Sequence, residues 1–360
     1  MKRRDFLQAT GAACAGFMLS RTVPLLADAS QPDWRTFEVT TEVEVLKPNG
    51  ETRIWLPTPL IRSTSFQKTL DNKFTAEGGK AKIDKINQGD LGIVSSSFPA
   101  GTKPVLTLTS RVSLKNYSVN LETPEHTHVS KSDLTYYLQP TKYIPTDGLV
   151  KETAEKATKG ATTDVDRARG IYEWIVENTY RNPKTKGCGR GDIRFMLESG
   201  DLGGKCADLN ALYVGMARSV GLPARDVYGL RVAKSELGYK SLGLSTPKAT
   251  KAQHCRAEVY LKEHGWVPVD PADVRKVMLE EPPGNRPVSD EMVSKARSRL
   301  FGSWEMNWMA YNYAHDVELP GSKLPPVVFF MYPQAETADG RLDPLDPDAF
   351  KYEIVAKEVV

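Results

Sequence analysis

Apolar and polar residues alternate through the first part of the chain, from Trp34 to about Leu121. The apolar members of this pattern are Phe37, Val39, Val43 and Val45, and later Leu106, Leu108, Val112 and Leu114. A period of two residues is typical of strands with one buried face. We therefore predict an N-terminal β-sandwich domain over residues 33–135.

The period becomes helical in the middle of the chain. A first amphipathic helix is predicted behind Thr163 and Asp164, since either residue can cap its first turn. A second is predicted from Cys206 to Val220, because Gly221 and Pro223 then stop it.

Strands are predicted next, over residues 224–232, 255–261 and 266–269. Helices followed by strands indicate an α+β domain, in which helices pack on an antiparallel sheet, and we place it at residues 136–285. Between the first two strands, residues 233–253 form a segment rich in lysine, serine and glycine that is too long for a mere connector.

The last part of the chain mixes both patterns. We predict a helix from Ser289 to about Ala314, followed by short β segments at 327–331 and 352–360. Residues 286–360 are therefore expected to form a C-terminal helical/β extension that packs on the core.

The N-terminus has the pattern of an export signal. Arg3 and Arg4 precede an apolar stretch from Ala9 to Leu19, and small residues ending at Ala29 suit cleavage. The paired arginines resemble a twin-arginine signal, and an ordinary export signal is the alternative. We predict that residues 1–29 are this signal and that the mature protein is periplasmic or otherwise exported.

Composition argues against two kinds of partner. The 48 Lys+Arg and 45 Asp+Glu residues nearly balance, so no nucleic-acid surface is expected. No apolar run reaches about 18 residues, so no integral membrane span is expected in the mature chain.

Cys206 occupies a position that favours reactivity. It follows Gly203 and Gly204 at the predicted start of a helix, where unpaired N–H groups and the helix dipole stabilise a thiolate. The same N–H groups could bind an oxyanion. The alternative is a small buried residue at a helix start.

A histidine and an aspartate follow on the predicted strands. His254 faces away from the apolar side defined by Cys255 and Ala257, and Asp270 ends the next strand, where it could orient the imidazole. Hairpin counting places Asp270 opposite Ala257, roughly 10 Å from His254. A bulge at Gly265 or Pro268 is then needed; otherwise Asp270 only caps the strand end.

These residues stand in blocks that resemble the transglutaminase-like superfamily. The blocks are Gly204–Asp208, Ala217–Arg225, His254 and Gly265–Pro271, within a similarity that runs from Asp164 to Asp273. The resemblance implies a papain-like α+β core with Cys206 as nucleophile, His254 as base and Asp270 as the orienting acid.

We therefore expect an exported cysteine enzyme that cleaves or transfers at an amide bond. The reaction would use a Cys206–His254–Asp270 triad and a thioester intermediate, with hydrolysis favoured over transfer. Its substrate is expected to be a peptide or another amide-bearing molecule, cell-wall fragments included, and no cofactor is required. The alternative is a non-catalytic module of the same fold that binds peptide or glycan.

Other features of the sequence carry weaker hypotheses. Cys188, Cys206, His254 and Cys255 lack the close spacing of a zinc site, so no metal is expected. A Cys188–Cys255 disulfide and a reduced pair both remain open. The four lysines of residues 233–253 suggest a mobile basic lip over the cleft that favours acidic substrates, with a solvated loop as the alternative.

Overall fold

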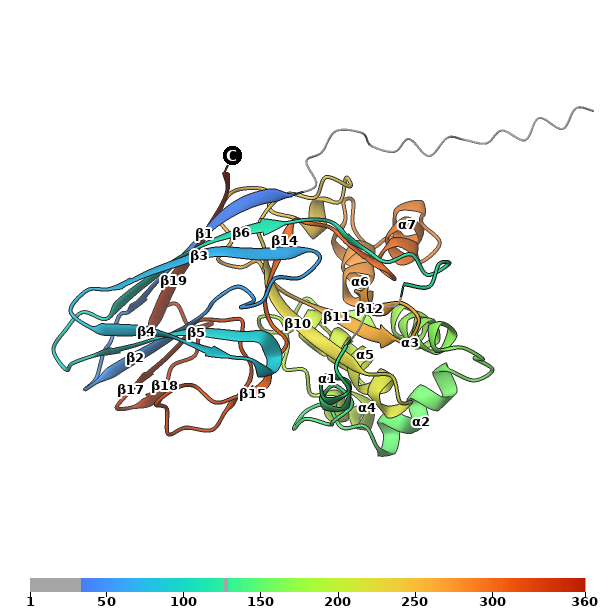
Figure 1. Ribbon diagram of the computed structural model, residues 1–360, viewed down its shortest axis with the longest axis horizontal. Coiled ribbons are helices and arrows are strands. Elements are labelled where there is room, and N and C mark those ends of the chain that lie inside the picture. The colour runs from blue at the N-terminus through green and yellow to red at the C-terminus, as the bar shows by residue number, and fades with distance from the viewer. Residues whose placement is uncertain (1–33, 126–128, 360) are drawn as a thin grey trace, which may run out of the picture. The chain divides into compact units, whose positions relative to one another are not determined.

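Two β-sheets combine strands from both ends of the chain in the computed structural model, which describes residues 34–125 and 129–359 (Figure 1). The predicted export signal at residues 1–29 lies outside the described residues. One sheet has the order β19-β1-β6-β3, with bounds Phe350–Val359, Arg35–Val45, Val105–Leu114 and Gln67–Ala76. The other has the order β18-β17-β2-β5-β4, with bounds Gly340–Arg341, Gln334–Thr337, Thr52–Pro57, Leu91–Phe98 and Lys80–Ile86.

These sheets share one hydrophobic core. Val43 and Val45 of β1 are buried in the same cluster as Ile54 and Leu56 of β2, and Phe350 of β19 joins them. The alternation seen in the sequence therefore marks the buried faces of β1 and β6, whose register pairs Val43 with Leu106.

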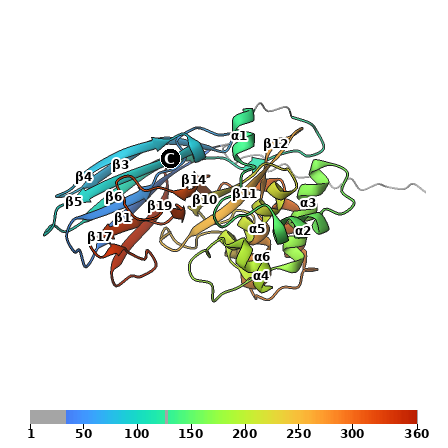
Figure 2. The ribbon, with the colours of Figure 1, turned by 90° about the horizontal axis from the view of Figure 1, so that it is seen from below.

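A second group of elements forms an α+β core around one central helix. Its sheet has the order β12-β11-β10-β14, with bounds Gly265–Val269, Gln253–Leu261, Ala224–Arg231 and Trp308–Asn312. Helix α5, Cys206–Ser219, packs against β10 and β11 (Figures 1 and 2). It also contacts the helices α2 (Gly148–Ala157), α3 (Asp164–Asn178) and α6 (Pro271–Glu280). Nearly every α5 side chain is buried, as expected for a helix enclosed on all sides.

The remaining helices have bounds Lys131–Tyr136 (α1), Gly148–Ala157 (α2), Asp164–Asn178 (α3), Ile193–Ser199 (α4), Pro271–Glu280 (α6) and Glu291–Arg299 (α7). The short strands are Tyr117–Ser118 (β7), Tyr180–Arg181 (β8), Gly203–Gly204 (β9), Ser303–Trp304 (β13), His315–Val317 (β15) and Val327–Phe329 (β16), and two 3-10 turns cover Gln88–Asp90 and Lys240–Leu242. None of the described helices is long and apolar enough to cross a bilayer.

Local signals in the sequence explain where α3 begins. The Thr163 hydroxyl accepts a hydrogen bond from the Asp166 N–H at 3.0 Å, and the Asp166 carboxylate accepts one from the Thr163 N–H at 3.2 Å. This reciprocal capping box confirms Thr163 as the N-cap. The helix predicted from Cys206 and the three strands predicted after it are also confirmed, within two residues at each end.

The predicted helix from Ser289 to Ala314 is wrong beyond Arg299. Helix α7 ends there, and the chain continues as β13 and β14 after Gly302, whose φ of +112° does not suit a helix. On β14, Met309 belongs to the cluster around α5, whereas Trp308 belongs to a second cluster. A strand that is apolar on both faces has no alternation, so its pattern can be mistaken for a helix.

The C-terminal part of the chain adds strands to the α+β sheet and to both sheets of the N-terminal strands. β14 extends the α+β sheet, while β17 and β19 extend the two sheets that the N-terminal strands begin. The described residues form one compact unit. The domain boundaries expected at residues 135 and 285 stay predictions.

Candidate active site

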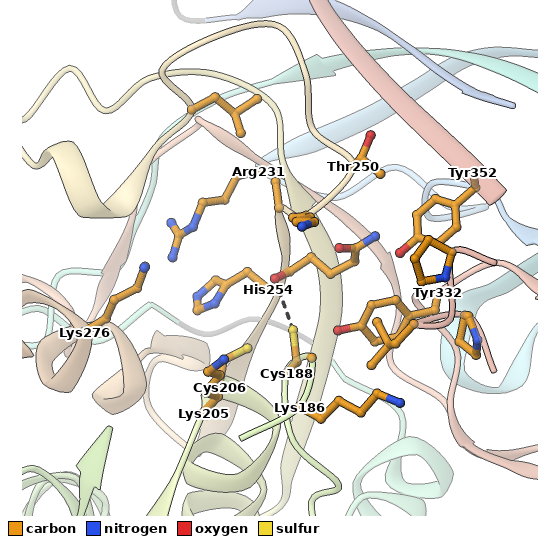
Figure 3. A pocket seen from close by; sticks show the side chains of 18 of the residues that line it. Lys186, Cys188, Lys205, Cys206, Arg231, Thr250, His254, Lys276, Tyr332 and Tyr352 are labelled. Carbon is orange, nitrogen blue, oxygen red and sulfur yellow. Dashed lines mark hydrogen bonds between the residues drawn. The ribbon is translucent and has the colours of Figure 1, made fainter. Parts of the chain in front are cut away.

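Cys206 is the first residue of α5, and the loops around it are fixed by Asp208. The Asp208 carboxylate accepts hydrogen bonds from the backbone N–H groups of Lys205, Arg190 and Gly191, each at 2.9 Å. A Cβ on Gly204 would lie 2.5 Å from the Asp208 Cβ, so glycine is needed there for close packing. These contacts hold Cys206 at the wall of a pocket (Figure 3).

Three buried thiols meet at this point. The Cys188 Sγ donates to the Gln253 carbonyl at 3.2 Å, and the Cys255 Sγ contacts the Met331 Sδ at 3.8 Å. All three cysteines are free thiols, so the Cys188–Cys255 disulfide is not formed in this structure.

The surroundings of Cys206 favour its thiolate. Hydrogen bonds from Cys188 and Cys255 lower its pKa, and the hydrogen bond and charge of His254 add to this. Together they outweigh burial and hold the pKa of Cys206 well below the ordinary range of a thiol. The pKa of Cys255 is raised, mainly by burial, so Cys206 is the cysteine that carries the negative charge.

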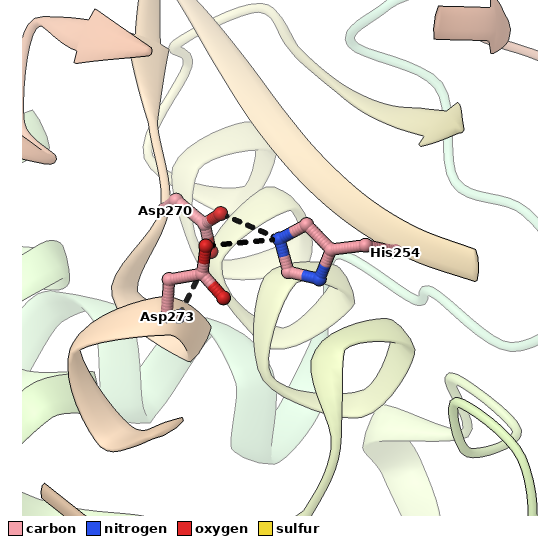
Figure 4. A group of neighbouring side chains, drawn as sticks. All are labelled: His254, Asp270 and Asp273. Carbon is pink, nitrogen blue, oxygen red and sulfur yellow. Dashed lines mark hydrogen bonds and ion pairs between the residues drawn. The ribbon is translucent and has the colours of Figure 1, made fainter. Parts of the chain in front are cut away.

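His254 lies on β11, where its Nε2 is 2.8 Å from the Asp270 Oδ2 (Figure 4). The predicted strand-end carboxylate therefore does reach the imidazole. Both atoms are buried, and the other ring nitrogen, Nδ1, points away from Asp270. Both carboxylates contact Nε2, so Nδ1 is the ring nitrogen left to face the thiol, and the charge of His254 contributes to the lowered pKa of Cys206.

The bulge predicted at Gly265 or Pro268 is wrong. The β11–β12 register is continuous, and it pairs Ala257 with Val269 because the turn is one residue shorter than the hairpin counting assumed. Asp270 follows directly as the N-cap of α6, and its Oδ1 accepts from the Asp273 N–H at 3.0 Å. One carboxylate thus caps the helix with one oxygen and holds His254 with the other.

Asp273 is a second carboxylate at the same imidazole, which the sequence interpretation missed. Its Oδ2 lies 3.4 Å from the His254 Nε2 (Figure 4). The Arg231 guanidinium also binds Asp273, with its Nη2 at 2.6 and 2.8 Å from the two oxygens. The spacing Asp270-x-x-Asp273 at a helix start was the available signal, since both side chains belong to the same first turn.

These charges set the protonation states. Burial and Arg231 lower the pKa of His254, but Asp273 and Asp270 outweigh them and raise it to about 10. Burial raises the pKa of Asp273, yet Arg231 and His254 hold it well below its usual value. The site therefore favours a thiolate on Cys206 and an imidazolium on His254 at neutral pH.

His254, Asp270 and Asp273 are close enough to suggest a metal site, with potential ligand atoms within 4.8 Å of one another. The chemistry of their surroundings does not fit a cation. Arg231 binds both oxygens of Asp273, and the Nε of Arg256 lies 3.6 Å from the Asp270 Oδ2. A metal ion would face two guanidinium groups here.

A thiol at the start of a buried helix, an imidazole on the adjacent sheet and a carboxylate just after that sheet's edge strand form the arrangement typical of papain-like α+β folds. The model of the transglutaminase-like superfamily matches residues 151–271. A protein of Haemophilus influenzae, described only as uncharacterized, is 32% identical over 92% of this chain and 95% of its own length. The chain belongs to the transglutaminase-like superfamily.

Two solved structures are similar to this chain. A candidate cysteine protease from Cytophaga hutchinsonii has a TM-score of 0.51 at 16% identity, and the match covers 91% of this chain and 99% of that one. The periplasmic domain of TgpA from Pseudomonas aeruginosa has a TM-score of 0.35 at 14% identity, over 69% of this chain and 90% of that one. The first of these similarities shows the fold.

Proposed function

We propose that this chain is an exported cysteine hydrolase that cleaves an amide bond of a peptide, with Cys206 as nucleophile. The supporting observation is that Cys206 and His254 share one pocket wall while two buried carboxylates hold the imidazole in its charged form. The sequence pattern of residues 1–29 supports export. The substrate is a peptide or another amide-bearing molecule, with cell-wall fragments among the candidates.

The chemistry follows from the protonation states. The Cys206 thiolate attacks the amide carbonyl carbon, and the carbonyl oxygen becomes an oxyanion. His254 gives its proton to the leaving amine as the C–N bond breaks, which leaves a thioester on Cys206. His254 then takes a proton from water, the hydroxide attacks the thioester, and the acid and the thiolate are released.

The start of α5 supplies one donor for the oxyanion. The Ala207 N–H already binds the Cys188 carbonyl at 2.9 Å, and the Asp208 N–H binds the Lys205 carbonyl at 3.1 Å. Among the described hydrogen bonds, the Cys206 N–H donates none, so it is the group we assign to the oxyanion. None of these steps needs a cofactor.

Incubation with a library of peptides and cell-wall fragments, with and without an added primary amine, tests the proposal. We expect products with free carboxylates from the wild type and none from Cys206→Ala. Amine adducts as the main product would instead assign acyl transfer. If no product depends on Cys206, the chain would be a non-catalytic binding module.

The pH dependence of turnover gives an independent check. The pKa of His254 is raised to about 10, so its charged form, and the stability it contributes, is fully present below about pH 6.5 and is lost as pH rises through about 10. The lowered pKa of Cys206 keeps the thiolate at a pH below the ordinary thiol range. We expect kcat/KM to hold across neutral pH and to fall near pH 10.

In Asp273→Asn, the alkaline fall should move to lower pH, because one of the two charges that raise the pKa of His254 is gone. Asp339→Asn, on an exposed turn, is the matched control and should not move it. A wild-type alkaline limb near the ordinary histidine pKa would contradict the predicted ion pair.

A further inference from the structure

The cavity beside Cys206 and His254 has an unusual distribution of charge. Its volume is about 660 Å³, and among the described residues that line it there are several lysines and arginines but no aspartate or glutamate (Figure 3). A cleft lined by charge of one sign concentrates ligands of the opposite sign.

Some of these cations have carboxylate partners behind the wall, but the partners are too few. Arg181 and Lys276 both contact the single carboxylate of Glu280. Lys186 pairs with Asp343 at 2.6 Å, with both side chains largely exposed. Burial lowers the pKa of Lys276, and the neighbouring charge of Arg181 lowers it further.

Three further lysines of the wall have no carboxylate within 4 Å among the described residues. These are Lys205 at the start of α5, Lys251 before β11 and Lys351 on β19. Arg231, which also lines the cavity, is already bound to Asp273. Lys351 stands opposite Glu44 in the β1–β19 register, without an ion pair within 4 Å, and its charge makes a minor contribution to the lowered pKa of that carboxyl. The three lysines come from three separate segments that meet at one cavity.

This distribution differs from the basic lip expected at residues 233–253. Of its four lysines, only Lys251 lines the cavity. Lys234 pairs with Glu236 at 3.6 Å, and Lys248 pairs with Glu353 at 3.5 Å. The positive charge belongs to the pocket wall as a whole rather than to a lip.

A buried amide provides an independent observation that points to a ligand at this wall. Gln253 lines the cavity one residue before His254, and its side-chain Nε2 is buried without a hydrogen-bond partner. The residue is only 9% exposed. Tyr352 lies beside this amide, but no hydrogen bond of normal geometry joins them. A buried N–H without an acceptor is unfavourable, and a substrate oxygen would supply the acceptor.

We propose that the pocket binds an anionic acyl donor, a peptide with carboxylates next to the reacting amide. Lys205, Lys251 and Lys351 determine this specificity by pairing with the carboxylates, and the Gln253 Nε2 donates to a substrate oxygen. The inference rests on the proposed function for the identity of the reacting bond, but the preference for negative charge can be tested without turnover.

The test measures binding to the Cys206→Ala protein, which keeps the pocket and cannot react. The probes are a glutamate-containing peptide, its glutamine counterpart, and a cell-wall stem peptide with free or amidated carboxylates. We expect each anionic probe to bind about tenfold more tightly than its neutral counterpart. This ratio should shrink toward one at about 1 M salt, where charges are screened within about 3 Å. The probe with the larger ratio identifies the source of the carboxylates.

Variants then assign the preference to residues. The triple variant Lys205→Gln, Lys251→Gln and Lys351→Gln should bring the ratio of anionic to neutral affinity to about one. The control is the triple variant Lys234→Gln, Lys240→Gln and Lys248→Gln, which removes the same charge from residues outside the cavity wall. It should leave the ratio unchanged. Equal affinity for anionic and neutral probes at low salt, or a ratio that only the second triple variant abolishes, would overturn the proposal. A preserved ratio in a protein without Cys206-dependent turnover would refute the hydrolase and leave the anion site standing.

Discussion

Cys206→Ala is expected to reduce kcat/KM for an amide substrate by about 10⁴-fold, and His254→Ala should do nearly the same. The reason is that the two side chains act as one ion pair: the thiolate is stabilised by the imidazolium, and the imidazolium has no amine to protonate unless the thiolate has attacked. The double variant should therefore be no worse than either single variant. Steady-state kinetics of the three proteins give the coupling between them.

A second buried histidine provides the control for this experiment. His315 has its Nε2 3.0 Å from the Asp226 Oδ2, which reproduces a His–Asp pair away from the pocket. His315→Gln should leave kcat/KM within about threefold, since it touches no group of the site. Additive losses at Cys206 and His254 would show that they do not act together. Asp270→Asn should cost less than either, because Asp273 still faces the imidazole.

The second large effect is expected on stability. Arg231→Met should lower the free energy of unfolding by about 3–5 kcal/mol, because it leaves the buried Asp273 carboxylate without its bidentate partner. Both side chains of this pair are almost fully buried. Urea denaturation followed by fluorescence measures the loss.

Lys186→Met is the matched control, since it breaks an ion pair of similar length whose side chains are 67% and 49% exposed. It should cost less than about 1 kcal/mol. A combined Arg231→Met and Asp273→Leu variant should regain part of the stability by removing the stranded charge. If Arg231→Met lowered the free energy of unfolding by less than about 1 kcal/mol, the buried Asp273 carboxylate would not need Arg231 as its charge partner.

Local patterns carried enough information to predict the centre of the molecule. Cys206 could be placed because it lies where a periodic helix starts, and His254 because it lies on the strand face opposite the apolar side of Cys255 and Ala257. The Thr163 cap could be placed for the same reason, since it depends on a residue only three positions away. Such features depend on near neighbours along the chain.

The features that were missed depend on distant contacts. Nothing near Asp273 indicates that Arg231, forty-two positions earlier, will bind it. The segment Trp308–Asn312 is a strand buried on both faces. Helices cover one face and aromatic rings cover the other. The pairing of β19 with β1 joins opposite ends of the described chain and leaves no periodic signal of its own.

That pairing has a consequence for when the pocket can be completed during synthesis of the chain. Lys351 and Tyr352 of β19 complete the cavity wall, and they are translated long after Cys206 and His254. Strand β1 is synthesised early, but it can pair with the edge strand β19 only after the C-terminus has been made. The pairs run from Thr36 opposite Val359 to Val45 opposite Phe350. A nascent chain on the ribosome therefore holds its thiol and imidazole in an unfinished pocket. The pocket wall is therefore completed only after the last strand has been synthesised and has paired with β1.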